Sequence, residues 1–100
     1  MIVYEVNLDV REDAYADYRA WLAGHVLEML ALPGFVSAET LELREPAPAP
    51  GRRAVTVQYR LTDATALARY LAEHAPRMRE AGLARFGGAF AATRRVLETV

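Results

Sequence analysis

The chain contains no cysteine and no lysine, and these absences exclude several kinds of chemistry. Without thiols it forms no disulfide and has no thiolate nucleophile. Without lysine it has neither a Schiff-base amine nor a Walker-type phosphate-binding loop. All twelve basic residues are arginines, and the chain has a single residue each of four polar or aromatic kinds: Asn7, Trp21, Ser37 and Gln58. The remaining catalytic groups are histidine, carboxylate, arginine, tyrosine and a few amides.

Composition also limits the partners of the chain. One hundred residues predict one domain spanning residues 1–100. A net charge of −1 provides no attraction to nucleic acid or anionic lipid. The sequence has no basic leader followed by an apolar run and no stretch long enough to span a bilayer, so we expect a cytoplasmic protein.

A strand–helix–strand pattern occurs twice along the chain. Alternating apolar residues predict strands over residues 2–8, 35–44, 53–61 and 90–98. Apolar spacings of three and four predict a helix after a cap at Asp9 and another after a cap at Asp63. The order β-α-β-β-α-β with right-handed crossovers places both helices on one face of a four-stranded antiparallel sheet, the ferredoxin-like α+β fold.

The only two histidines, His25 and His74, each lie on the apolar stripe of a predicted helix. We therefore expect both imidazoles to point into the same interior. Pro76 should break the second helix just after His74, and a helix end favours the imidazolium form there. The two rings could then act as acid and base across a small pocket. The alternative is two independent core histidines.

The need of these two imidazoles for hydrogen-bond partners also bears on which face of the sheet is buried. The first strand has an apolar face and a mixed face that carries Glu5 and Asn7. If the apolar face lies under the helices, each imidazole lacks partners, at a cost of roughly 1–3 kcal/mol. We therefore favour the opposite arrangement, with Glu5, Asn7 and Gln58 beneath the helices. The apolar sheet face is then covered by a second subunit, which predicts a homodimer formed sheet to sheet.

Several further residues have two interpretations. The simplest interpretation of five apolar or aromatic residues is an ordinary core, but an apolar pocket wall would use the same residues: Tyr18, Trp21, Met29, Tyr70 and Phe86. The predicted ligand-binding set is Trp21, Gln58, Tyr59, Met78 and Phe86. Gly24, beside His25, leaves room either for a ligand or for a close helix contact. The run 77–85 contains three arginines and would receive a carboxylate or phosphate, or form a solvated face. Arg94 and Arg95 are expected to be surface charges, with one stem directed inward.

Asn7, the segment Leu32–Phe35 and the order of elements resemble the dimeric α+β barrel superfamily, which includes antibiotic-biosynthesis-type monooxygenases and haem-degrading enzymes. A closer resemblance, to the DUF4286 family, covers nearly the whole chain. It rests on the segments Met1–Asn7, Trp21–Val26, Val57–Arg60, His74–Arg79 and Leu83–Gly87. The resemblance implies the fold and a homodimer, and it implies no reaction.

The superfamily offers several activities on this fold. In haem-degrading members an asparagine and a histidine flank the substrate, and Asn7 and His74 match those two positions. Their second-helix tryptophan has no counterpart, because Trp21 belongs to the first helix, which argues against haem degradation. Cofactor-independent monooxygenases of the superfamily oxidise electron-rich aromatics, while its isomerases and lyases need only acid–base groups. Fold alone does not choose among these activities.

The leading hypothesis is an enzyme that acts without a cofactor on a small aromatic or polyketide-like molecule. His25 and His74 would move protons, Asn7 and Gln58 would orient a carbonyl or phenol, and Glu5 would orient a histidine. The alternative is a non-catalytic ligand-binding or dimerisation module. A metal site built from His25, His74 and Glu5 has no supporting ligand spacing. RNA binding is not expected, because the predicted third strand does not match the RNA-recognition signature.

Overall fold

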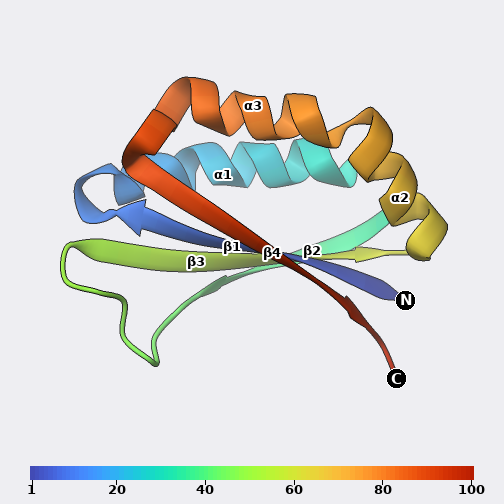
Figure 1. The fold of residues 1–100 in the computed structure, drawn as a ribbon, viewed down its shortest axis with the longest axis horizontal. Helices are drawn as coiled ribbons and strands as arrows, with labels where there is room; N and C mark the ends of the chain where they lie inside the picture. The colour runs from blue at the N-terminus through green and yellow to red at the C-terminus, as the bar shows by residue number, and fades with distance from the viewer.

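The computed structural model describes all residues, 1–100, as a four-stranded antiparallel sheet with three helices on one face (Figure 1). The strands are β1 (Ile2–Arg11), β2 (Phe35–Glu42), β3 (Arg52–Leu61) and β4 (Phe90–Glu98). The helices are α1 (Tyr15–Leu30), α2 (Ala64–Glu73) and α3 (Ala75–Phe86), and short 3-10 turns at Glu12–Ala14 and Gly87–Ala89 precede α1 and β4.

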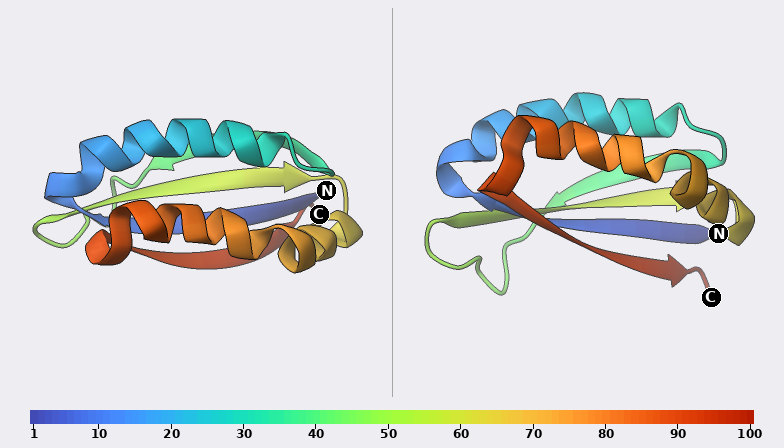
Figure 2. Two further views of the ribbon diagram at one scale, coloured as in Figure 1. Left: turned by 90° about the horizontal axis from the view of Figure 1, so that it is seen from above. Right: turned by 45° about the horizontal axis from the view of Figure 1, so that its top comes forward.

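The sheet has the strand order β2-β3-β1-β4, so β1 lies in the middle and pairs with both β3 and β4. The register places Tyr4 opposite Tyr59 and Asn7 opposite Thr56. Helices α1 and α3 run above the sheet, and α2 lies at one end of it (Figures 1 and 2). This arrangement confirms the predicted ferredoxin-like α+β fold.

Two of the three predicted helix boundaries are correct. The side chain of Asp63 accepts a hydrogen bond of 2.8 Å from the backbone N–H of Ala66, as an N-cap does. The second helical segment breaks at His74, and Pro76 occupies the first turn of α3, where its missing N–H is tolerated. Asp9 is not a cap, because β1 continues through it and pairs it with Ala54.

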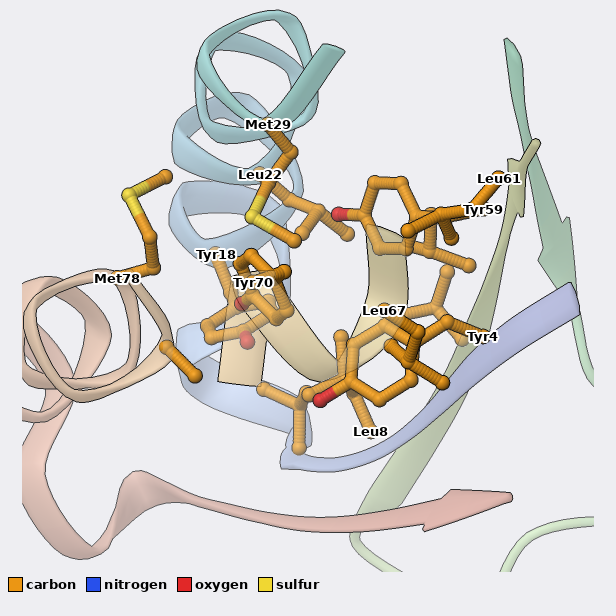
Figure 3. Packing of buried hydrophobic residues seen from close by; sticks show 14 of the residues in the cluster. Tyr4, Leu8, Tyr18, Leu22, Met29, Tyr59, Leu61, Leu67, Tyr70 and Met78 are labelled. Atoms are coloured by element: carbon orange, nitrogen blue, oxygen red, sulfur yellow. The ribbon is translucent and has the colours of Figure 1, made fainter. Parts of the chain in front are cut away.

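The apolar face of the sheet, and not the mixed face, lies under the helices. The buried cluster joins this face to the inner sides of the three helices and contains 16 residues, among them Tyr4, Leu8, Tyr59, Leu61, Tyr18 and Tyr70 (Figure 3). The prediction that Glu5, Asn7 and Gln58 lie beneath the helices is therefore wrong. They belong to the opposite face, which no helix covers (Figure 2) and against one end of which the β2–β3 loop places Pro48 and Ala49, beside Asn7.

The magnitudes explain why that prediction failed. Burying one aliphatic or aromatic side chain contributes about 1.5–3 kcal/mol. The apolar faces of β1 and β3 together bury a row of such side chains, including Ile2, Leu8, Val55 and Leu61. An unpaired imidazole nitrogen costs only about 1–3 kcal/mol. Hydrophobic burial over two whole strands thus outweighs the cost of an unpaired imidazole nitrogen.

Candidate functional site

A cavity of about 330 Å³ lies between the helices and the apolar face of the sheet. Its wall takes residues from α1, α2, α3, β1, β3 and β4, and 15 of its 19 lining residues are hydrophobic. Buried side chains from these elements converge on the space between α1 and the sheet (Figure 3). Ligand pockets range over about 300–1,000 Å³, so this cavity suits a small, mostly apolar molecule.

Glycine allows two helices to meet at one wall of the cavity. Gly82 on α3 lies against the ring of Trp21 on α1, and a Cβ atom at residue 82 would approach that ring to 3.1 Å. Gly24, by contrast, is exposed, and a Cβ atom there would have no neighbour within 4 Å. Gly24 therefore provides neither room for a ligand nor a helix contact.

Three tyrosine hydroxyls supply polar groups to the apolar wall. Tyr18, Tyr59 and Tyr70 all line the cavity, and none of their hydroxyls hydrogen-bonds to another protein group, unlike those of Tyr4 and Tyr15. Burial raises the pKa of Tyr18 and of Tyr70 to about 12, and it raises the pKa of Tyr59 further. All three hydroxyls therefore keep their protons at neutral pH and are free to donate a hydrogen bond to a bound molecule.

His25 is the titratable imidazole of the cavity wall. Its ring stacks on Trp21 with centroids 4.6 Å apart and planes 20° apart. Its Nδ1 is the one fully buried side-chain nitrogen or oxygen without a hydrogen-bond partner. Burial lowers the pKa of His25, and the charge of Glu28 opposes this shift. The ring is therefore neutral at pH 7 and able to accept a proton.

The opening of the cavity lies between α3 and β4. The exposed residues of its lining all come from these two elements: Arg79, Leu83, Ala91 and Arg94. The Arg79 guanidinium donates a hydrogen bond of 3.1 Å to the Tyr4 hydroxyl. Arg94 faces the helices because it pairs with Val6, whose neighbours Tyr4 and Leu8 are in the core. The opening is thus apolar with two positive charges.

The structure places three of the predicted ligand-binding residues in the cavity wall, namely Trp21, Tyr59 and Met78. Phe86 lies behind the wall, with its ring centroid 4.9 Å from that of Tyr18 and 5.7 Å from that of Trp21. Gln58 lies on the uncovered face of the sheet.

His74 does not line the cavity. It occupies the junction of α2 and α3, where its Nδ1 lies 2.9 Å from Arg77 Nη1 and its Nε2 lies 3.8 Å from a carboxylate oxygen of Glu73. The break at Pro76 turns the chain at this point, so His74 finds partners within its own helices. The structure thus does not bring His25 and His74 together as the expected pair.

Glu5 is the centre of a polar network on the uncovered sheet face. Its carboxylate accepts hydrogen bonds from Asn7, Gln58 and Arg95, at 3.0, 3.0 and 2.7 Å. These bonds, led by that from Arg95, lower the pKa of Glu5 to about 2 although burial opposes the shift. Thr56 donates to Asn7 Oδ1 at 2.7 Å. Because the sheet separates this network from the cavity, Glu5 and Asn7 do not contact His25.

The three residues of the considered metal site are therefore apart. No group of three or more histidine, cysteine, aspartate or glutamate side chains is arranged to hold a metal ion. In addition, no helix is both long and apolar enough to cross a bilayer.

Sequence reasoning missed the polar groups of the cavity wall, which are tyrosine hydroxyls and two arginine guanidiniums. In the sequence, the simplest interpretation of Tyr18 and Tyr70 is as core residues, and Arg79 is one of three arginines in a run. The available signal was the register of the last strand, in which Phe90, Ala92 and Arg94 alternate onto one face. That alternation identifies Arg94 as the arginine with the inward stem.

Solved structures share this fold at low sequence identity. SnoaB, a cofactor-independent oxygenase from Streptomyces nogalater, matches with a TM-score of 0.65 and 20% identity over 98% of this chain and 92% of its own. A variant of MhuD with manganese protoporphyrin IX bound in its active site matches with a TM-score of 0.74 and 16% identity, over 100% and 95% of the two chains. A dimeric ferredoxin-like protein from an uncultured marine organism matches with a TM-score of 0.69 and 11% identity, over 99% of this chain and 94% of its own.

These similarities establish the fold and not the reaction. No curated protein sequence matches the chain. The model of the domain of unknown function DUF4286 matches residues 1–100, the whole chain. This match agrees with the motif resemblance in the sequence, and the protein belongs to the DUF4286 family.

Proposed function

We propose that the protein binds a small aromatic or similarly flat molecule in the cavity and that His25 removes a proton from it. The observation that carries this proposal is a neutral, partly buried imidazole, with an unpaired Nδ1, in the wall of an otherwise apolar cavity. A residue that leaves a hydrogen-bonding atom unsatisfied costs folding free energy, so its presence in a cavity wall favours a functional role.

The surrounding groups suit proton removal from a phenol, an enol or an activated C–H. The proton would pass to the imidazole of His25, and the negative charge left on the substrate would accept hydrogen bonds from Tyr18 and Tyr70. Loss of a proton is a step shared by oxidation of an electron-rich aromatic by molecular oxygen and by isomerisation or lyase reactions. The structural similarity to the oxygenase SnoaB favours oxidation by molecular oxygen.

The proposal changes the roles predicted from sequence. His25 retains the role of proton acceptor, whereas His74 has no place at the cavity and the predicted histidine pair is reduced to one ring. Asn7, Glu5 and Gln58 would act on the uncovered sheet face and not on the substrate. We assign the orientation of the substrate oxygen to the tyrosine hydroxyls instead.

Binding can be tested with 2-naphthol because Trp21 is the only tryptophan and lines the cavity. We expect 2-naphthol to shift the single indole N–H resonance of Trp21 in a nitrogen–proton correlation spectrum. The Ala92→Phe variant places a ring in the cavity and should abolish the shift. The matched control is Ala23→Phe on the exposed face of α1, which should retain it. An unchanged Trp21 resonance in the wild-type protein would contradict the proposal.

The alternative is a non-catalytic binding module with the same cavity. This alternative is favoured by the low sequence identity to SnoaB and MhuD, since the same fold also occurs without a shared reaction. Both proposals predict binding of 2-naphthol, and only the first predicts that His25 takes up its ligand's proton.

We also propose that the protein forms a homodimer through the uncovered sheet face. This face exposes Leu41 and Leu97 on the two edge strands, around the Glu5 network at its centre. Covering such a face removes apolar area from water. The neighbouring dimeric ferredoxin-like protein has the same fold.

Sedimentation equilibrium should therefore give twice the chain mass of 11.1 kDa. Leu97→Arg should shift the population toward the monomer, because an arginine would be desolvated at the interface. Leu27→Arg, on an exposed position of α1, is the control and should leave the mass unchanged. A monomeric wild-type protein at high concentration would show that the face is simply solvated.

A further inference from the structure

The charged groups of the cavity are all of one sign. Arg79 and Arg94 are its two charged lining residues, and the lining contains no aspartate or glutamate. Neither guanidinium forms an ion pair with a carboxylate, whereas Arg52, Arg69 and Arg95 do. The chain as a whole carries a net charge of −1, so this concentration of positive charge is local.

The two guanidiniums lie at the opening of the cavity. Arg79 on α3 and Arg94 on β4 come from the two elements that supply all the exposed lining residues. Leu83, one turn after Arg79 on α3, is 52% exposed and adds apolar surface to the opening. A ligand that enters here would pass its apolar part inward and leave a polar group between the arginines.

The charges of these arginines also reach the interior. Burial raises the pKa of Tyr70, and the positive charges of Arg79 and Arg94 act against that rise. Arg94 acts in the same direction on the pKa of Tyr18. The inner hydroxyls and the outer guanidiniums thus form one set of donors, and none of them is paired with a carboxylate.

We propose that the natural ligand of the cavity is an organic anion, an apolar ring system that bears a carboxylate, and that Arg94 and Arg79 bind the carboxylate at the opening between α3 and β4. The inference rests on the proposed function, because it names the class of molecule that the same cavity accepts. Guanidinium groups match a carboxylate in geometry and form charge-assisted hydrogen bonds with it. The Arg94 guanidinium forms no ion pair, whereas that of its neighbour Arg95 does, so Arg94 loses no carboxylate partner when it binds such a group.

The test compares by calorimetry the affinities of two ligands of nearly equal size, 2-naphthoate and the neutral 2-naphthamide. A shift of the Trp21 indole resonance shows that each ligand binds in the cavity. We expect 2-naphthoate to bind about tenfold more tightly, as a charged hydrogen bond at a partly exposed site provides. Added salt should weaken the binding of 2-naphthoate and leave that of 2-naphthamide unchanged.

Variants then assign the effect to the opening. Arg94→Gln and Arg79→Gln should each lower the affinity for 2-naphthoate by about tenfold without altering that for 2-naphthamide. Arg69→Gln on the outer face of α2, whose arginine pairs with Glu73, is the matched control and should change neither affinity. Because the Arg94 side chain is exposed and makes no hydrogen bond, its replacement should leave thermal unfolding unchanged.

The outcomes separate the inference from the function on which it rests. If 2-naphthol shifts the Trp21 resonance but 2-naphthoate binds no more tightly than 2-naphthamide, the cavity is a ligand site and the anion inference is wrong. The inference also fails if Arg94→Gln weakens both ligands equally. If 2-naphthol and both carboxyl derivatives leave Trp21 unchanged, the inference and the proposed function fail together.

Discussion

Replacing His25 by leucine is expected to stop proton transfer in the cavity while leaving the protein as stable as before or slightly more stable. A positioned proton acceptor typically contributes about 10²–10⁴-fold to a rate, so turnover of the natural substrate should fall by that amount. Stability should not fall, because leucine removes the buried Nδ1 that has no partner. Removal of this unpaired atom contributes about 1 kcal/mol or more to stability, and this gain offsets the cost of altered packing on Trp21.

The effect can be measured before the substrate is identified. Bound 4-nitrophenol absorbs as its phenolate only if it has lost its proton, so its spectrum reports deprotonation in the cavity, and variants of the two histidines test whether His25 takes the proton. We expect the phenolate band in the wild-type complex at a pH where free 4-nitrophenol is protonated, and its loss in His25→Leu. His74→Leu is the control and should retain the band, because His74 lies outside the cavity. A band that persists in His25→Leu would remove His25 from the proposed mechanism.

The second large effect is expected at Glu5, on the other face of the sheet. Its carboxylate is buried beneath its own partners and has a pKa of about 2, below the usual 4.5. A carboxylate with a lowered pKa stabilises the folded state fully above the unfolded pKa, and this contribution is lost as the pH falls toward the folded value. Stability should therefore decline between about pH 4.5 and pH 2.

The size of this decline is reduced by solvent. Arg95, the strongest partner, has a side chain that is 65% exposed, so solvent screening weakens the stabilisation of the ionised carboxylate. We therefore expect the free energy of unfolding to fall by about 2 kcal/mol over this pH range. Urea unfolding across this pH range should show that loss in the wild type and a flatter dependence in Glu5→Gln. Glu80→Gln, an exposed carboxylate of α3 without a hydrogen bond, is the control and should keep the wild-type slope. An unchanged slope in Glu5→Gln would show that the network does not stabilise the ionised form.

The fold was predictable because its signals are local and repeated. Alternation in the strands and the cap at Asp63 each follow from a few neighbouring residues, and the break at Pro76 follows from one. The order of elements then leaves few topologies. The extension of β1 through Asp9 was not predictable from its own residues, because pairing with Ala54 on β3 decides it.

The site was only partly predictable because it depends on how the free energy of hydrophobic burial compares with the cost of an unpaired imidazole nitrogen. The assumption that both histidines need partners led to the wrong sheet face. In the structure His74 obtains a partner from Arg77 on its own helix, and His25 leaves Nδ1 unpaired. Empty space leaves no mark in a sequence either: Tyr18 and Tyr70 read as core residues until the cavity between them and the sheet is seen.

The most direct test of the cavity as a ligand site uses the three methionines of the chain, labelled with carbon-13 at their methyl groups. Met29 and Met78 line the cavity, whereas Met1 is exposed at the chain terminus and is a control within the same molecule. With 2-naphthol bound, nuclear Overhauser effects should connect the ligand protons to the methyl groups of Met29 and Met78 and not to that of Met1. Contacts to Met1 alone, or to none of the three, would contradict the account.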